Sequence, residues 1–387
     1  MRIVLTGGGT AGHINPALAL AERLEADGHE VCYAGTPTGV EARLVPQAGI
    51  AFFPFEGAGF DRERPWTIAS STVKLYASSL RARSWMKKMR PDVVVCFGGY
   101  VSIPVGFAAS RLGIPVVVHE QNSVMGMANR FLAKRARKVA LTYAVTEKDV
   151  RPGTAVVTGN PVRSSVVTST RAQGREMLGV PEDATLLVVF GGSLGAQHVN
   201  EAVCRLKERL LAVDGLFVVH VAGTGNYEET ACALDLDDAE KERWKLFAYQ
   251  DRMPEVLAAA DAVLSRAGAT SLAEIAAIGV PALLVPFPYA AEDHQTINAR
   301  SYVESGAARM IADADIVIRR SEPSGPTDPS IRRSWPPDRR RCGRRCRCRP
   351  WSTTRGGSCP SCGRPPRPQR TGRGSLRPIH PRPRHSS

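Results

Sequence analysis

Short apolar runs alternate with longer amphipathic stretches from the start of the chain. The run at 2–6 is followed by a stretch of helical periodicity from Pro16 to Leu24. Later runs at 93–97 and 186–190 are apolar at every position, which suits strands that helices cover on both faces. We therefore expect an α/β protein with parallel sheets. The strands expected are 2–6, 30–34, 93–97, 115–118, 185–190, 216–221, 245–248, 262–265 and 281–285.

The same pattern begins again in the second half of the chain. After a polar stretch, a new apolar strand at 185–190 leads into a second glycine-rich turn at 191–196. The simplest architecture is two doubly wound, Rossmann-like domains, residues 1–163 and 164–317. Each begins with a strand, a glycine-rich turn and a helix, and a ligand is expected in the cleft between them.

The end of the chain differs in composition from the rest. The 387 residues carry a net charge of +14, but residues 319–387 hold 19 arginines and three acidic residues, so the preceding part is close to neutral. The same segment contains no alanine, valine, phenylalanine, tyrosine, methionine or lysine. Because it cannot bury enough apolar surface to offset its chain entropy, we expect 318–387 to be a disordered basic tail.

Arginine without lysine, beside proline, glycine and cysteine, is the composition that GC-rich DNA gives when it is translated out of frame. Our hypothesis is a frameshift near residues 316–320, and a gene sequence without an upstream insertion or deletion would rule it out. The five cysteines of the tail lack the spacing of a paired zinc knuckle, so we expect no zinc there. We expect no nucleic-acid binding by the folded part, because the positive charge is confined to the tail.

Targeting signals are not evident in the sequence. No apolar run approaches the ~20 residues that a membrane-spanning helix needs. The N-terminus enters a strand-like run directly and lacks the charged, apolar and cleavage regions of a secretory signal. From these features alone we expect a cytoplasmic protein.

The first glycine-rich turn, residues 7–13, joins the first strand to the first helix. Its glycines let a ligand approach the backbone, and the helix N-terminus directs free N–H groups at an anion. The spacing is not G-x-G-x-x-G and no acidic residue follows the second strand, which argues against a dinucleotide site. His13 is a candidate general base, although a lone histidine often makes only a structural hydrogen bond.

Two segments of the second half combine small residues with polar ones. The turn at 191–196 suits a diphosphate, because Ser193 adds a hydroxyl to the backbone donors. Thr270 and Ser271 offer donors near the start of a helix, and Glu274 lies one turn further along. The Glu274 carboxylate can accept hydrogen bonds from ribose hydroxyls, or it can simply stabilise the helix dipole.

Two further polar clusters follow expected strands. Gln295 and Asn298 offer amides suited to sugar hydroxyls. Asp293 and His294 are adjacent, and adjacent side chains rarely converge on one ion, so we expect no metal site there. Residues 119–122 (His-Glu-Gln-Asn) come at the carboxyl edge of the first sheet, where they line either a ligand site or a solvated loop.

Residues 66–90 mix aromatic and aliphatic side chains with basic ones. The segment holds two tryptophans, one tyrosine and six lysines or arginines. A basic amphipathic stretch of this kind suits adsorption to an anionic membrane surface. A helix that packs on the core and exposes a charged outer face is the other interpretation.

Taken together, these motifs resemble those of the MurG family, the peptidoglycan N-acetylglucosaminyltransferases that make lipid II. They occur in the order of the family across about residues 1–315. The motifs are 7–13 with Asn15 and Pro16, 98–102, 119–122, 159–163, 191–196, and 266–274 with Gln295. The resemblance implies a GT-B fold, in which two Rossmann-like domains face each other across a cleft. The first domain takes the acceptor and the membrane, and the second takes the donor.

The resemblance also implies a reaction. N-acetylglucosamine (GlcNAc) passes from UDP-GlcNAc to the C4 hydroxyl of the muramoyl sugar of lipid I, with inversion and without a cofactor or bound metal. It implies a peripheral protein on the cytoplasmic face of the cell membrane, bound through residues 66–90. The donor-site residues that it implies are Thr10, Ala11, Gly12, Asn122, Arg163, Ser193, Gln250, Ala269, Thr270, Ser271, Leu272, Ala273, Glu274 and Gln295.

An inverting transfer needs one base that deprotonates the acceptor hydroxyl and a site that stabilises the departing UDP. His13 is our hypothesis for the base, with His119 or Glu120 as alternatives. The chain departs from the family at its C-terminus, where members have helices that complete the second domain. The open alternatives are a GT-B enzyme with another acceptor, a UDP-GlcNAc 2-epimerase, an RNA-binding protein led by its tail, and an inactive frameshifted product.

Overall fold

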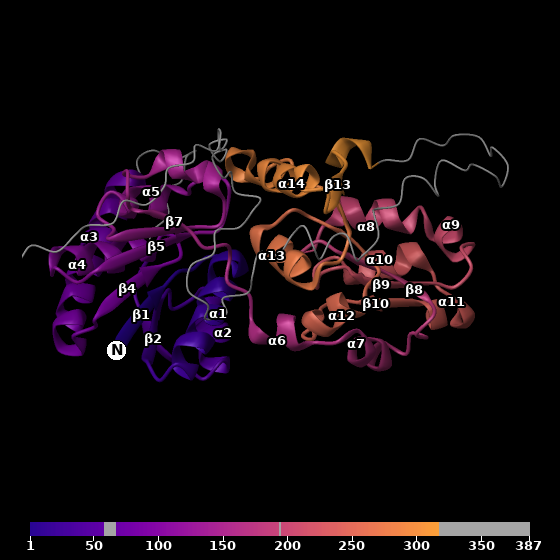
Figure 1. Ribbon diagram of the computed structural model, residues 1–387, viewed down its shortest axis with the longest axis horizontal. Helices are drawn as coiled ribbons and strands as arrows, with labels where there is room; N and C mark the ends of the chain where they lie inside the picture. The colour runs from indigo at the N-terminus through magenta and orange to yellow at the C-terminus, as the bar shows by residue number, and fades with distance from the viewer. Residues whose placement is uncertain (58–66, 193–194, 317–387) are drawn as a thin grey trace, which may run out of the picture.

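The computed structural model describes residues 1–57, 67–192 and 195–316, and Figure 1 shows two α/β units side by side. Trp66, Ser193 and the basic segment 318–387 with its cysteines, for which we stated expectations, lie outside the described residues. Within the described part, no helix combines the length and the apolar character needed to cross a membrane.

The first unit is a parallel sheet of seven strands in the order β3-β2-β1-β4-β5-β6-β7. Its strands are β1 (Arg2–Thr6), β2 (Glu30–Gly35), β3 (Ala51–Pro54), β4 (Val93–Cys96), β5 (Val116–Glu120), β6 (Lys138–Leu141) and β7 (Ala155–Val157). Its helices are α1 (Ala11–Ala26), α2 (Glu41–Gln47), α3 (Thr67–Met89), α4 (Ser102–Arg111), α5 (Met127–Ala133) and the 3₁₀ helix η1 (Ala144–Asp149).

The second unit is a parallel sheet of six strands in the order β10-β9-β8-β11-β12-β13. Its strands are β8 (Thr185–Phe190), β9 (Leu216–Val221), β10 (Trp244–Phe247), β11 (Ala262–Ser265), β12 (Ala282–Leu284) and β13 (Ala308–Met310). Its helices are α6 (Ser164–Thr168), α7 (Arg171–Leu178), α8 (Gln197–Cys204), α9 (Lys207–Leu211), α10 (Tyr227–Leu234), α11 (Asp238–Arg243), α12 (Met253–Ala259), α13 (Ala269–Ile278) and α14 (His294–Glu304), with the 3₁₀ helices η2 (Ala291–Asp293) and η3 (Asp313–Asp315).

The continuous apolar runs are explained by burial on both faces of each sheet. Ile3 and Leu5 of β1 belong to one buried cluster, whereas Val4 between them belongs to another. In β8, Val188 and Val189 divide between two clusters in the same way. Successive side chains of a strand point to opposite faces, so a strand covered on both sides must be apolar at every position.

All nine expected strands are confirmed, four of them residue for residue and the others within two residues. β3, β6, β7 and β13 were missed. They are short strands at or next to the edges of the sheets, and several of their residues are exposed or half-buried. Because such strands are not covered on both faces, they lack the continuous apolar run that identifies a central strand.

The order of strands places a topological switch point after the first strand of each sheet. β1 lies between β2 and β4, and β8 lies between β9 and β11. The chain therefore turns in opposite directions from these central strands, which is the switch point where open α/β sheets bind ligands. The glycine-rich turns at 7–13 and 191–196 follow β1 and β8, so both stand at switch points.

The boundary between the units remains our assignment at residue 163. Helices α6 and α7 follow that residue, and both pack against α12 of the second sheet. This packing supports the assignment of residues 1–163 to the first domain and 164–317 to the second.

Candidate active site

The glycine-rich turn after β1 is packed tightly between two other segments of its own domain. A Cβ at Gly8 would lie 2.2 Å from the Glu41 carboxylate, and a Cβ at Gly99 would lie 2.3 Å from the Gly8 carbonyl oxygen. Gly9 has a φ of +85°, a conformation that favours glycine. Neighbouring protein atoms therefore require glycine at these positions, whereas close approach of a ligand to them stays a prediction.

His13 lies in the first turn of α1, with one ring nitrogen bonded and the other open. Its Nδ1 is 3.0 Å from the Gly8 carbonyl oxygen and 3.2 Å from the Thr10 hydroxyl. Because a carbonyl only accepts, Nδ1 must carry the proton of the neutral ring, and Nε2 then holds a lone pair. None of the described residues hydrogen-bonds Nε2. A Cβ at Gly98 would lie 3.1 Å from this atom, so that glycine keeps the space beside it clear.

Burial keeps the His13 ring neutral near pH 7. Burial lowers the pKa of His13, although the hydrogen bond to Gly8 and the negative charges of Glu120 and Glu41 act in the opposite direction. A neutral imidazole with a free Nε2 is the form that can accept a proton.

His119 is bonded through both of its ring nitrogens. The sequence placed it after a strand, but β5 continues to Glu120, so His119 is a buried strand residue. Its Nε2 lies 3.1 Å from the Gly159 carbonyl oxygen, and its Nδ1 lies 3.1 Å from the Gln121 amide nitrogen. Burial lowers the pKa of His119 to about 4. The ring is therefore neutral and tied into the fold.

Glu120 organises the loop that follows β5. Its Oε2 accepts hydrogen bonds from the Gly126 N–H at 3.1 Å and the Asn129 amide at 2.8 Å. Its Oε1 accepts from the backbone N–H of Asn122 at 3.0 Å and from the Asn122 side chain at 3.4 Å. A carboxylate with this many donors is an anchor for the loop, and it holds Asn122 at the edge of the sheet.

The loop after β5 meets α14 of the second domain. Ser123 donates its backbone N–H and its hydroxyl to the Asn298 amide oxygen at 2.9 and 2.8 Å. The Asn298 amide nitrogen donates to the Asn122 side chain at 3.2 Å and to the Ala267 carbonyl at 3.4 Å. Asn298 is fully buried. We expected this amide to face sugar hydroxyls, but the structure uses it to join the two domains.

Other contacts place the two candidate halves of the site at this junction. Helix α1, which carries His13, packs against α13, which carries 269–274 (Figure 1). Asn160 donates to the Ala269 carbonyl at 3.3 Å, and Arg130 lies 3.6 Å from the Glu292 carboxylate. The helices that carry His13 and residues 269–274 are therefore brought together.

The segment before α13 is held by buried polar groups. Arg266 is buried and donates to the carbonyls of Val285 and Pro286 and to the Asp313 carboxylate. The Gln295 amide oxygen accepts from the backbone N–H groups of Ala267 and Phe287 at 3.2 and 3.0 Å. Gln295 thus fixes the loop that leads into α13, and Asp313 ties the last described segment to it.

Two groups on α13 suit a polar ligand. The Thr270 hydroxyl is buried without a hydrogen-bond partner among the described residues, which is costly unless a ligand or water supplies one. Glu274 is half-buried, and burial raises the pKa of its carboxyl to about 7, although the positive charge of Arg163 acts in the opposite direction. Ala269 and Leu272 are buried, whereas Ser271 and Ala273 are half-buried.

The remaining donor-side candidates are less fully described. A Cβ at Gly191 would lie 2.3 Å from the Ala196 nitrogen, so the turn after β8 needs glycine there, but Ser193 itself is not described. Gln250 is half-buried, and its amide oxygen accepts from the Arg252 N–H at 3.0 Å. Thr10 is exposed, and Ala11 and Gly12 are half-buried at the start of α1.

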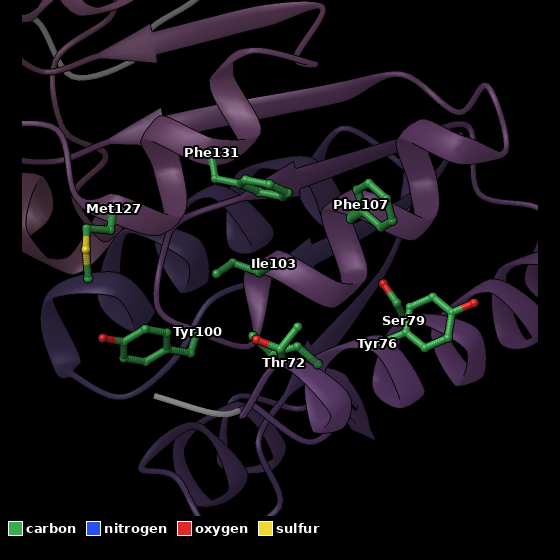
Figure 2. Close-up of a pocket in the computed structure, with 9 residues that line it drawn as sticks. Thr72, Tyr76, Ser79, Tyr100, Ile103, Phe107, Met127 and Phe131 are labelled. Atoms are coloured by element: carbon green, nitrogen blue, oxygen red, sulfur yellow. The ribbon is translucent and has the colours of Figure 1, made fainter. Parts of the chain in front are cut away.

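Helix α3 has an inner face that packs on the core and an outer face that remains exposed. Trp85 contacts Phe53 and Phe55, with ring centroids 4.9 and 5.2 Å apart, whereas Val73 and Tyr76 are more than 60% exposed. Beside it, residues of α3, α4 and α5 line an apolar pocket of about 350 Å³ that is partly open to solvent (Figure 2). The packed inner face supports our interpretation of a core-packing helix, whereas adsorption of this stretch to a membrane stays a prediction.

The chain matches one protein family along most of its length. Residues 3–141 match the glycosyltransferase family 28 N-terminal domain, and residues 186–320 match the C-terminal domain of the same family.

Named relatives cover both domains. One relative is the UDP-N-acetylglucosamine–N-acetylmuramyl-(pentapeptide) pyrophosphoryl-undecaprenol N-acetylglucosamine transferase of Halothermothrix orenii. The two sequences are 41% identical over 322 residues, and the alignment covers 82% of this chain and 87% of the relative. The protein of the same name from Carboxydothermus hydrogenoformans is 42% identical over 323 residues, covering 81% and 85%. The crystal structure of Acinetobacter baumannii MurG superposes with a TM-score of 0.62 at 30% identity, covering 81% of this chain and 86% of that one.

Proposed function

Because the chain belongs to glycosyltransferase family 28, we propose that it transfers GlcNAc from UDP-GlcNAc to lipid I (undecaprenyl-pyrophosphoryl-MurNAc-pentapeptide) and forms lipid II for peptidoglycan. The names of the relatives supply the substrates. The observation that carries the proposal for this chain is His13, a neutral histidine near His294 of the second domain whose Nε2 has no hydrogen-bond partner among the described residues. The two facing Rossmann-like sheets are the GT-B architecture.

In the proposed reaction, His13 acts as the general base. Its Nε2 takes the proton of the C4 hydroxyl of MurNAc while that oxygen attacks the anomeric carbon of GlcNAc. The new C–O bond forms as the bond from the anomeric carbon to the β-phosphate oxygen breaks, and its electron pair leaves with UDP. Attack from the face opposite UDP inverts the anomeric centre. The protonated Nδ1 stays on the Gly8 carbonyl throughout, so only Nε2 changes its protonation state.

His119 and Glu120 are better suited to positioning than to proton transfer. Both nitrogens of His119 bond to the protein, and Glu120 accepts hydrogen bonds from the residues that shape the loop after β5. We assign them the role of holding Asn122 and the loop against the second domain, and we retain His13 alone as the base.

The donor is proposed to bind across α13 and the turn after β8. Glu274 accepts hydrogen bonds from the ribose hydroxyls, and the unpartnered Thr270 hydroxyl bonds to the ligand. Backbone N–H groups at the helix N-terminus offset the charge of the departing diphosphate without a metal ion. The other proposed contacts are Thr10, Ala11, Gly12, Asn122, Arg163, Ser193, Gln250, Ala269, Ser271, Leu272, Ala273 and Gln295.

The lipid acceptor implies work at a membrane surface. We propose that the protein adsorbs to the cytoplasmic face through the exposed side of α3, next to the apolar pocket in Figure 2. Tyr76 and Leu80 are exposed there, and exposed basic residues such as Lys74 and Lys87 lie on the same helix. Binding to vesicles that contain anionic lipids should weaken as salt is added, and binding that ignores salt and lipid charge would contradict the proposal.

A coupled assay tests the reaction. The purified protein should release UDP from UDP-GlcNAc only when a lipid I analogue is present, and the product should carry the added GlcNAc. UDP release without an acceptor, or conversion of UDP-GlcNAc to its 2-epimer, would point to another enzyme of the same fold. A second protein, in which C-terminal helices from a relative replace residues 318–387, is assayed beside it. Activity in this protein alone would mean that the C-terminal segment abolishes the reaction, whereas no activity in either would mean that the function is assigned wrongly.

A further inference from the structure

Glu41 is a fully buried carboxylate that our sequence argument did not single out. It is the first residue of α2, and within the described chain it forms no ion pair. Its Oε2 accepts the Gly9 N–H at 3.3 Å, and its Oε1 accepts the Thr36 N–H at 3.1 Å together with the Thr36 hydroxyl. Burying an unpaired carboxylate is costly, so its hydrogen bonds must replace the water that it loses.

Three glycines make room for this side chain. A Cβ at Gly8, Gly35 or Gly39 would lie 2.2, 2.7 or 2.3 Å from Glu41 atoms. Gly8 belongs to the turn after β1, Gly35 ends β2, and Gly39 precedes α2. The carboxylate therefore lies in a cradle of backbone that three separate positions keep free of side chains.

The cradle is one hydrogen bond away from His13. The Glu41 carboxylate accepts a hydrogen bond from the Gly9 N–H. The carbonyl of the preceding residue, Gly8, accepts one from Nδ1 of His13. On its other side the turn is closed by Gly99, which approaches the Gly8 carbonyl closely. Any movement of the turn would thus move the partner that sets the tautomer of His13.

We propose that Glu41 is a positioning residue for His13. It fixes the turn at 7–9 so that the Gly8 carbonyl keeps the proton on Nδ1 and leaves Nε2 open, and its negative charge stabilises the imidazolium that forms when Nε2 accepts a proton. The second part rests on the proposed function, because it concerns the base of that reaction.

The charges that act on His13 come from three elements. Glu41 on α2 and Glu120 on β5 favour the protonated ring, and His294 on α14 disfavours it. Removing the charge of Glu41 should therefore lower the pKa of His13 further, and the change can be assigned because the other two groups stay in place.

Two substitutions separate charge from geometry. Glu41→Gln keeps the size of the side chain but loses the charge, and its NH2 group cannot accept from Gly9 or Thr36, whichever residue it faces. The His13 titration and the acid limb of kcat/KM for the acceptor should therefore move to lower pH, and kcat should fall about tenfold. Glu41→Asp keeps the charge but cannot reach both Gly9 and Thr36, so kcat should fall while the acid limb stays near its wild-type position. The KM for UDP-GlcNAc should change less than about twofold in both.

The titration of the His13 ring is followed by NMR of isotope-labelled histidine, with the signal assigned through its loss in His13→Asn. This measurement needs no substrate, so failure of the proposed reaction would leave it intact. Glu25→Gln, an exposed carboxylate on the same helix as His13, is the matched control and should leave the titration unchanged.

A Glu41→Gln protein that loses thermal stability but keeps the wild-type His13 titration and acid limb would overturn the proposal and leave Glu41 a purely structural group. If Glu41→Gln does not fold, Thr36→Val removes one donor to Glu41 and keeps its charge. That variant should lower kcat about threefold, and wild-type kcat in it would also overturn the proposal.

Discussion

His13 and His119 lie at the same edge of the first sheet, one after a glycine-rich turn and the other at the end of a strand. Their imidazole rings make different hydrogen bonds. Among the residues that the structure describes, His13 bonds through Nδ1 alone, to the Gly8 carbonyl and the Thr10 hydroxyl. His119 bonds through both nitrogens, to the Gly159 carbonyl and the Gln121 amide. Burial lowers the pKa of both rings, so both are neutral near pH 7. The rings differ in whether a lone pair remains available.

The difference shows that residue type and position at a sheet edge do not by themselves assign a catalytic role. A neutral imidazole has one donor nitrogen and one acceptor nitrogen. In each ring a carbonyl accepts from the donor nitrogen, but within the described part of the chain only His119 has a second partner, which donates to the acceptor nitrogen. The free acceptor of His13 is therefore what makes it the candidate base, and substitutions can test this contrast directly.

The largest effect is expected from the base. His13→Ala should lower kcat by about 100-fold or more, because general-base catalysis typically contributes that much. In the wild-type enzyme, kcat should fall as the pH drops below 6.5 and His13 becomes protonated; the lowered pKa places this fall on the acid side of that value. Steady-state rates of UDP release across pH measure both. Wild-type turnover in the variant would exclude His13 as the base.

A smaller effect is expected from Glu274 on the donor side. There a carboxyl group, and not an imidazole, changes its protonation state near neutral pH. With a pKa of about 7, Glu274 loses its charge as the pH falls through 7, so the KM for UDP-GlcNAc should rise before kcat falls. Glu274→Gln should raise this KM about tenfold at pH 8 and remove its dependence on pH near 7. Glu228→Gln, exposed on α10 of the same domain, should behave as wild type. A donor KM that ignores pH in the wild-type enzyme would argue against contact with Glu274.

The smallest catalytic effect is expected from His119→Ala, which should lower kcat only a few-fold. Its main consequence should be a Tm lower by roughly 5–10 °C, because two buried hydrogen bonds are lost. The folded pKa of about 4 lies below the usual value near 6.5, so the unfolded chain binds more protons between these values. Wild-type stability should therefore fall as the pH is lowered from 6.5 towards 4, and less so in the variant. A 100-fold loss of kcat with an unchanged Tm would reverse the roles of the two histidines.

Much of the fold followed from local patterns. Central strands such as β1 and β8 were identified because burial on both faces requires an apolar residue at every position. Edge strands such as β3 and β13 were missed, since partial exposure removes that signal. The end of β5 was placed two residues early because His119 and Glu120 are polar, although both are buried in the strand.

The site was predicted in outline but not in its connections. The glycine-rich turns and the polar residues after strands marked the right edges of both sheets. Nothing local distinguished Glu41, since a glutamate at the start of a helix is ordinary. Asn298 was taken for a sugar contact, because an amide in a polar segment carries no sign of the partner that buries it.

The sequence by itself determined which strands form the centre of each sheet, where the backbone can turn tightly and which chemical groups stand after those strands. These properties depend on residues close together in the chain. The resemblance of the sequence to a known family added the expected reaction. Only the tertiary structure decided which nitrogen of His13 lacks a partner among the described residues, that both nitrogens of His119 are hydrogen-bonded, and that Glu41 accepts a hydrogen bond from the turn before His13. Such choices depend on partners tens of residues away, as with Glu41 and Gly9 or His119 and Gly159, because hydrogen bonds form between groups that folding brings together.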